Sequence, residues 1–222
     1  MNAQQSPSGS RPPSNAAWTY AETWLDDAEP IRAARAKAAD LGVVPVSQAV
    51  ANTLSLLAAS IAAGAVVEVG TGTGVSGAAL LAGMTDDGVL TSIDIEAENQ
   101  RAARDLFTAI GVDHVRTRLI AGRALEVLPR LTDAAYDIVF ADGDPAEYPA
   151  ILAQAARLLR PGGLVVFADV LGSSDLADPG QRDPEALALR DVAHALRDDD
   201  AWLPALLTVG NGLLVATWRP AD

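Results

Sequence analysis

The chain has 222 residues and a formal net charge of −13, from 29 acidic and 16 basic side chains, and it contains no cysteine. This length suits one α/β domain with a substantial core. The negative charge repels phosphate backbones, which argues against a nucleic-acid substrate. The lack of cysteine excludes disulfides, zinc–thiolate sites and cysteine nucleophiles.

The hydropathy pattern and the first residues exclude two further classes. No apolar run approaches the roughly 20 residues that a membrane span requires, so no membrane partner is expected. Residues 1–15 are rich in Ser, Pro and Asn and carry no apolar stretch typical of a signal peptide. We therefore expect a disordered leader over residues 1–15, a single domain over residues 16–222, and a cytoplasmic protein.

The first part of the domain is predicted to be helical. Pro30 favours the first turn of a helix, and Gly42 favours its end. Val43 to Val46 form an extended connector, and Ser47 is a suitable N-cap for a longer helix. The helices are expected at 16–28, at 31–41 and from Ser47 to about Ala63.

Residues 66–77 are the most informative stretch of the chain. The β-branched run 66–69 predicts a buried strand, and the alternating glycines in 70–74 predict a tight turn that opens a helix. Because glycine has no Cβ, such a turn lets backbone N–H groups approach a ligand closely. Residues 72–77 match the dinucleotide fingerprint G-x-G-x-x-G. Residues 68–74 match acidic-x-Gly-x-Gly-x-Gly, which resembles motif I of S-adenosylmethionine (SAM)-dependent methyltransferases, and a turn without a ligand is the third interpretation.

Beyond residue 66, apolar strand-like runs alternate with helical stretches, which predicts a parallel sheet covered on both faces. Strands are expected at 66–69, 89–93, 115–120, 137–141, 164–168, 203–209 and 213–218. Helices are expected at 75–84, 97–110, 124–131, 148–159 and 184–197. Gly210-Asn211-Gly212 is a hairpin signal, so the last two strands should be antiparallel.

The predicted fold class is therefore α/β. We expect a Rossmann-like, doubly wound, mostly parallel seven-stranded sheet with an antiparallel C-terminal hairpin and N-terminal helices. A classical dinucleotide fold would more naturally continue its parallel alternation. The terminal hairpin instead resembles the class I methyltransferase architecture.

Polar residues follow the predicted strands at the edge where open α/β sheets bind ligands. Asp94 ends the second strand, where a carboxylate can accept both hydroxyls of a ribose while Ile95 packs on a purine. Asp142 and Asp144 follow the fourth strand, as a candidate ligand of a divalent ion and a candidate cofactor contact. The alternative for these acids is helix capping and turn formation.

The segment Leu158-Leu159-Arg160-Pro161-Gly162-Gly163-Leu164 ends a predicted helix and starts the fifth strand. After a glycine-rich loop and an aspartate-ended strand, it resembles the LxPGG element of class I methyltransferases. Asp169 ends the fifth strand, which lies beside the fourth in that architecture. Asp142 and Asp169 are therefore candidates to share a hard cation with substrate oxygens and water.

With these motifs in order, residues 43–218 resemble the cation-dependent O-methyltransferases of the catechol and caffeoyl-CoA type, including their small bacterial members. The resemblance implies SAM as cofactor, a small-molecule hydroxyl acceptor and a homodimer. The cofactor-binding residues that it implies are Val46, Glu68, Gly70, Thr71, Gly72, Ser76, Asp94, Ile95, Ala124 and Asp144. It implies Asp142 as the catalytic residue, and Asp142 with Asp169 as metal ligands.

Two departures from the family pattern concern the metal and the general base. Val170 stands where the family has an asparagine ligand, so a bound Mg²⁺ would lose one protein oxygen. The family's lysine near the first metal ligand falls at Pro145 or its neighbours, and no lysine follows Lys37. Methyl transfer needs an ionised oxygen held in line with the sulfonium. The chain is thus expected to use an acidic acceptor, another base or no metal, or to bind SAM without efficient turnover.

The leading hypothesis is a SAM-dependent O-methyltransferase that acts on a hydroxyl of a catechol- or phenol-like small molecule, with Mg²⁺ left open as a second cofactor. One alternative is a SAM-binding protein with weak or no turnover. The other is an NAD-dependent oxidoreductase, which rests on residues 72–77 and Asp94. The sequence shows no evident hydride site for it, and the terminal hairpin argues against it.

Overall fold

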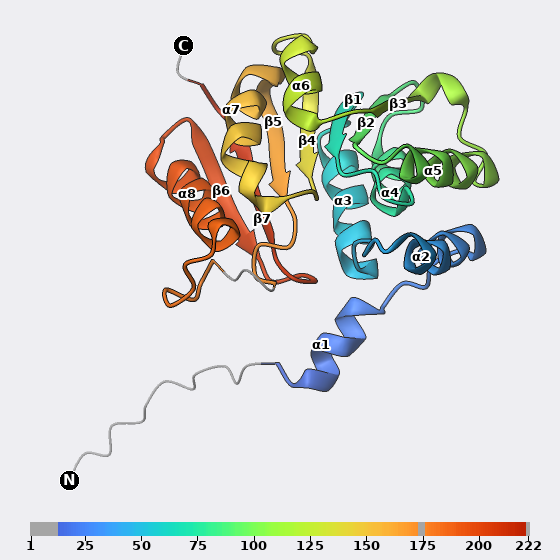
Figure 1. Ribbon diagram of the computed structural model, residues 1–222, viewed down its shortest axis with the longest axis horizontal. Helices are drawn as coiled ribbons and strands as arrows, with labels where there is room; N and C mark the ends of the chain where they lie inside the picture. Colours follow the sequence, from blue (N-terminus) through green and yellow to red (C-terminus); the bar gives the residue numbers. More distant parts are fainter. Residues whose placement is uncertain (1–12, 173–175, 221–222) are drawn as a thin grey trace.

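The computed structural model describes residues 13–172 and 176–220. Its strands are β1 (Ala65–Val69), β2 (Val89–Asp94), β3 (Thr117–Ala121), β4 (Tyr136–Ala141), β5 (Leu159–Phe167), β6 (Trp202–Leu207) and β7 (Leu213–Trp218). They form one sheet in the order β3-β2-β1-β4-β5-β7-β6 (Figure 1). Strands β1 to β5 pair in parallel, and β7 is antiparallel to both β5 and β6. The predicted fold class is confirmed.

The helices cover both faces of this sheet. They are α1 (Asn15–Glu22), α2 (Glu29–Leu41), α3 (Gln48–Ser60), α4 (Val75–Gly83), α5 (Ala97–Ala109), α6 (Ala124–Val127), α7 (Tyr148–Leu158) and α8 (Pro184–Asp198), with the short 3₁₀ turns η1 (His114–Arg116), η2 (Leu128–Arg130) and η3 (Pro145–Glu147). No helix in the described part of the chain combines the length and apolar character needed to cross a membrane.

The core consists of two buried layers, because successive strand residues point to opposite sides of a sheet. In β4, Ile138 and Phe140 pack on the side of α3, α4 and α5. Val139 and Ala141 pack on the side of α6, α7 and α8. All four side chains are fully buried. A strand buried on both faces explains why the β4 sequence is a continuous apolar run after Asp137.

The first helix and the third strand differ from their predicted bounds. The helix ends at Glu22 rather than at residue 28. The third strand begins at Thr117 rather than at Val115, because the Asp113 carboxylate accepts a hydrogen bond from the Val115 N–H at 3.1 Å and caps η1. A local side-chain bond thus competes with strand pairing at this point.

The strand with the LxPGG element also begins earlier than predicted. Leu159 already pairs with Tyr136, while Leu164 pairs with Ile138, so a register shift in β5 accommodates the residues 160–163. Irregular pairing of this kind is where a sheet tolerates proline and glycine. The element therefore lies at the amino end of β5, away from the strand end that carries Asp169 in the chain.

Residues 1–12 of the predicted leader lie outside the described residues. Ser14, near the end of that prediction, instead caps α1. Glu22 at the other end of α1 accepts hydrogen bonds from the Ser47 Oγ at 2.7 Å and from the Gly210 N–H at 2.6 Å. These two bonds connect α1 to the start of α3 and to the turn between β6 and β7.

Candidate functional site

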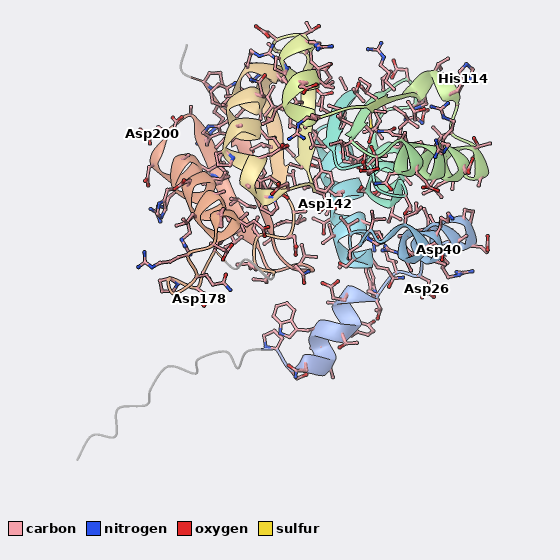
Figure 2. The ribbon with its side chains drawn as sticks, in the orientation of Figure 1. Asp26, Asp40, His114, Asp142, Asp178 and Asp200 are labelled. Atoms are coloured by element: carbon pink, nitrogen blue, oxygen red, sulfur yellow. The ribbon has the colours of Figure 1, made fainter. Side chains whose placement is uncertain are left out.

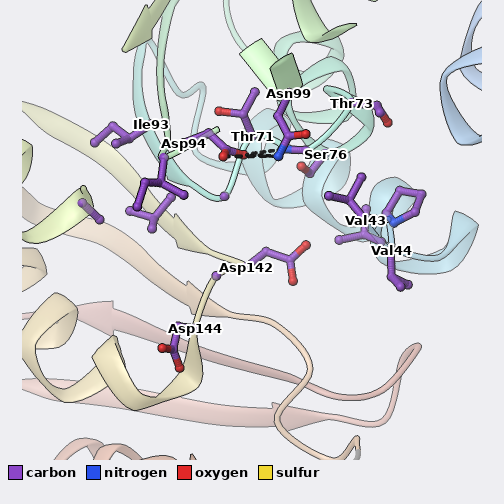
Figure 3. A pocket seen from close by; sticks show the side chains of 18 of the residues that line it. Val43, Val44, Thr71, Thr73, Ser76, Ile93, Asp94, Asn99, Asp142 and Asp144 are labelled. Atoms are coloured by element: carbon purple, nitrogen blue, oxygen red, sulfur yellow. Dashed lines mark hydrogen bonds between the residues drawn. The ribbon is translucent and has the colours of Figure 1, made fainter. Parts of the chain in front are cut away.

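The carboxyl ends of β1, β2 and β4 border a cavity of about 460 Å³, with the connector 43–46 on another side (Figure 3). Nine of the ten residues predicted to bind a cofactor line it: Val46, Gly70, Thr71, Gly72, Ser76, Asp94, Ile95, Ala124 and Asp144. Asp142 also lines it, and Figure 2 shows Asp142 near the centre of the molecule. The fold therefore brings together residues from segments that are far apart in the sequence.

The turn after β1 approaches its neighbours so closely that glycine is needed at two positions. Gly70 has a φ of +91°, and a Cβ on it would lie 2.3 Å from the carbonyl oxygen of Asp142. Gly74 has a φ of +85°, and a Cβ on it would lie 2.9 Å from the Cα of Ala103 in α5. The Gly70 N–H donates to the Ile93 carbonyl at 2.9 Å. The turn is thus wedged between β4 and α5 and forms one wall of the cavity.

Glu68 lies beneath this turn. Its side chain is fully buried, and its carboxylate accepts hydrogen bonds from Ser76 Oγ at 2.6 Å and from Ser92 Oγ at 2.5 Å. Thr71 Oγ1 lies within hydrogen-bond distance of Ser92 Oγ, at 2.6 Å, and accepts a bond from Gln100 Nε2 at 2.9 Å. This buried network connects β1, the turn, β2, α4 and α5.

The resemblance implies that Glu68 helps to organise the glycine turn around the amino-acid end of SAM, and the geometry shows which residues Glu68 contacts. Its carboxylate does not line the cavity; it holds Ser76 directly and Thr71 through Ser92, and both Ser76 and Thr71 do line the cavity. Burial raises the pKa of Glu68 to about 7, although the two serine hydroxyls oppose the rise. Glu68 is therefore a buried support for the turn.

Asp94, at the end of β2, holds the turn from the other side. Its carboxylate accepts hydrogen bonds from the Gly72 N–H at 3.0 Å and from the Glu96 N–H at 2.8 Å. The Asn99 side chain of α5 donates to both oxygens at 3.2 Å (Figure 3). The bond to Glu96 is the turn-forming role that the sequence left open, and Asp94 combines it with a place in the cavity wall beside Ile95.

The two aspartates after β4 have different surroundings. Asp142 is partly buried, and burial, followed by the nearby charge of Asp169, raises the pKa of Asp142 to about 7. Asp144 is exposed at the cavity, and its Oδ1 accepts a hydrogen bond from the Ala146 N–H at 2.9 Å, which caps η3. Asp144 therefore caps η3 and also lines the cavity. Asp142 lines the cavity as well and is a candidate to contact a ligand.

A family profile described as O-methyltransferase matches residues 23–218. The chain belongs to the O-methyltransferase family. A relative from Mycobacterium sp. (strain JLS), itself named an O-methyltransferase, is 46% identical over 217 residues, which cover 97% of this chain and 99% of the relative.

Two solved structures extend the likeness of this O-methyltransferase to the fold. A Corynebacterium glutamicum protein is 31% identical with a TM-score of 0.84, covering 92% of this chain and 96% of that chain. The O-methyltransferase TomG from Streptomyces achromogenes, involved in tomaymycin synthesis and solved in complex with SAM, is 28% identical with a TM-score of 0.83, covering 93% and 97%. These findings confirm the predicted resemblance and favour the methyltransferase interpretation of the glycine-rich turn over the dinucleotide one.

Among the residues that the structure describes, the donor set of this O-methyltransferase does not fit a resident divalent cation. Val170, at the position of the family's asparagine ligand, is fully buried in an apolar cluster. Asp169 lies near enough to act on the charge of Asp142 but does not line the cavity. Within residues 13–172 and 176–220, no three or more His, Cys, Asp or Glu side chains are grouped as metal ligands would be. The cavity, the glycine turn and Asp94, in contrast, fit SAM.

Several supporting residues of the O-methyltransferase site escaped the sequence analysis. Arg35 of α2 pairs with Asp27 at 2.6 Å and donates to the Val46 carbonyl in the cavity wall. Ser92 had a detectable signal, because a polar side chain inside an apolar strand calls for a buried partner. Arg35 and Gln100 had none, since their partners are distant in the sequence.

Proposed function

We propose that this O-methyltransferase binds SAM in the cavity at the ends of β1, β2 and β4 and methylates a hydroxyl of a small, catechol- or phenol-like acceptor. The observation that carries the proposal is the convergence of nine predicted cofactor residues on one cavity. When bound, SAM supplies a methyl group activated by a positively charged sulfonium. TomG, which shares the fold and was solved with SAM, supports the choice of cofactor.

In this proposal, different residues of the cavity contact different parts of SAM. Asp94 holds the ribose hydroxyls, as carboxylates at the second strand end do in nucleotide-binding sheets. Ile95 and Ala124 pack against the adenine. The backbone of Val46 and the turn after β1, with Ser76, hold the methionine end, and the buried Glu68 network keeps that turn in place.

Asp142 is the proposed general base. A pKa of about 7 suits a carboxylate that accepts a proton near neutral pH. No lysine follows Lys37, so no other lysine can take the place of the one that the family has near the first metal ligand. In this proposal the acceptor hydroxyl gives its proton to the Asp142 carboxylate at the cavity wall.

Asp94→Ala is expected to weaken SAM binding at least about tenfold, or roughly 1.4 kcal/mol. The variant removes the carboxylate that holds both the Gly72 N–H and, in the proposal, the ribose. Isothermal titration of each protein with SAM measures the effect. Asp113→Ala is a matched control, because Asp113 makes a comparable capping bond to the Val115 N–H far from the cavity. Equal affinity of Asp94→Ala and the native chain would contradict the site.

Turnover is expected to persist without added metal, because the described residues around Asp142 do not form a donor set that fits a resident cation. Formation of S-adenosylhomocysteine from SAM is measured with catechol, protocatechuate and an acidic nitrophenol, in EDTA and in Mg²⁺. We expect rates within about twofold of each other, since no Lewis acid is being removed. Activity that vanishes in EDTA and returns with Mg²⁺ would contradict this expectation.

The same panel separates the enzyme from a second candidate, a SAM-binding protein with weak or no turnover. Val170 and the lack of a lysine after Lys37 favour that candidate. Intact SAM binding without methylation of any acceptor would support it.

A further inference from the structure

Tyr148, the first residue of α7, lies directly behind the ends of β4 and β5. Its side chain is fully buried, and its ring packs on Phe167 of β5 with 4.9 Å between the ring centroids. The hydroxyl lies 3.1 Å from the Ala168 carbonyl oxygen and 3.3 Å from the Ala141 carbonyl oxygen. These two residues immediately precede Asp169 and Asp142. One hydroxyl therefore contacts the backbone just before each of two carboxylates.

The segments that follow β4 and β5 separate at this point. The last bond between the two segments runs from the Ala168 N–H to the Ala141 carbonyl at 2.9 Å. Beyond it, the Asp142 N–H turns to the Val69 carbonyl of β1, and the Val170 N–H turns to the Gly212 carbonyl of the β6–β7 turn. Within the described residues, no further strand pairing holds the two aspartates at a set distance, so their spacing depends on the contacts made where β4 and β5 end.

Asp169 itself adopts a conformation that needs such support. Its φ is +58°, in the left-handed region that non-glycine residues rarely occupy. A conformation of this kind is unfavourable and persists where the surrounding contacts determine it. The Tyr148 hydroxyl holds the carbonyl of the residue before it.

We propose that Tyr148 is a positioning residue whose hydroxyl sets the spacing between Asp142, in the cavity wall, and Asp169, outside the cavity lining. This inference rests on the proposed function, in which Asp142 receives the acceptor proton. Packing alone does not require the hydroxyl, because a phenylalanine ring would fill the same space. Burying a hydroxyl is favourable only where its hydrogen bonds are made, and here both partners flank the acidic pair.

The hydroxyl remains a donor throughout the neutral pH range. Burial first, and then the charges of Asp142, Asp169 and Asp144, raise the pKa of Tyr148 well above its ordinary value. The Gly143 backbone also bonds the hydroxyl and has the opposite, smaller effect. Tyr148 therefore takes no proton from the acceptor and acts through the backbone of β4 and β5.

The test compares Tyr148→Phe with Tyr136→Phe. Tyr136 lies at the opposite end of β4, is 9% exposed and does not line the cavity, so Tyr136→Phe controls for removing a tyrosine hydroxyl from the same part of the sheet. For Tyr148→Phe we expect kcat with catechol to fall about tenfold, because a displaced base loses alignment with the acceptor. The Kd for SAM should stay within about twofold of the native value. Tyr136→Phe should retain native kcat and SAM affinity.

Hydrogen exchange gives a second readout that needs no acceptor. Tyr148→Phe should accelerate exchange of the amides of residues 168–171, while Tyr136→Phe should not. If the native chain methylates none of the probes, the proposed function fails, and the exchange result alone decides the role of Tyr148. Native kcat together with native exchange in Tyr148→Phe would overturn the inference. A kcat loss that follows a lower Tm and disappears on cooling would also overturn it.

Discussion

Gly70→Ala is expected to abolish measurable SAM binding, a loss of more than about a hundredfold in affinity. The added Cβ would lie 2.3 Å from the Asp142 carbonyl oxygen, and it belongs to a residue with a φ of +91°. Both atoms at the clash are held by backbone, so neither can rotate away. The turn and the end of β4 must therefore separate, and these are two walls of the cavity. Titration calorimetry with SAM measures the loss, and circular dichroism reports whether the fold is kept.

The Gly111→Ala variant distinguishes the effect of backbone strain from the effect of the steric clash expected in Gly70→Ala. Gly111 also has a positive φ, +73°, but a Cβ on it would meet nothing within 4 Å. It follows α5 and does not line the cavity. This variant should lose stability of about 1 kcal/mol through strain and bind SAM as the native chain does. Native SAM affinity in Gly70→Ala would show that the turn and β4 need not be in close contact for binding.

Stability should fall as the pH rises from about 5 to 8, and Glu68 should account for a large share of the change. The pKa of Glu68 is raised from 4.5 to about 7, mainly by burial. The folded state therefore keeps a proton that the unfolded state releases in this window. Since each pKa unit corresponds to about 1.4 kcal/mol, Glu68 contributes about 3 kcal/mol that is present below pH 4.5 and lost as the pH passes 7.

Asp142 acts in the same direction, because its pKa is also raised to about 7 from 3.8. Glu68→Gln isolates the share of Glu68, since the amide cannot ionise. Urea unfolding at pH 5 and pH 8 should show a smaller loss of unfolding free energy for Glu68→Gln than for the native chain. Glu98→Gln, on the exposed face of α5, is the control and should follow the native slope. Parallel slopes for Glu68→Gln and the native chain would contradict burial as the cause.

Local sequence patterns were sufficient to predict the strands of the sheet and the glycine-rich turn after β1. The apolar run before Gly70 and the alternation that follows it depend on neighbours in the chain, and the structure has these strands and helices nearly where they were predicted. The hairpin at residues 210–212 is likewise a short-range signal. The third strand begins later than predicted because of a capping bond at Val115, and the fifth begins earlier because of a register shift at residues 160–163. The periodicity of apolar residues predicts neither feature.

The strand-end aspartates were found because a parallel sheet gathers its carboxyl ends at one edge. Asp94 lies where that rule puts it, and its bonds to Gly72 and Asn99 fix its orientation. The same rule could not show that Asp169 stays outside the cavity lining. That outcome depends on the left-handed turn and on the contacts of Val170 with the β6–β7 turn.

The amino-acid sequence by itself determined the order of strands and helices, the glycine turn and the edge at which a ligand would bind, because each follows from residues close together in the chain. The tertiary structure alone decided that Ser76 and Ser92 are the partners of the buried Glu68 carboxylate, that Val170 is buried in the core and that Tyr148 contacts both strand ends. Each of these depends on partners brought together by packing. Their hydrogen bonds and burial exist only once the sheet has formed.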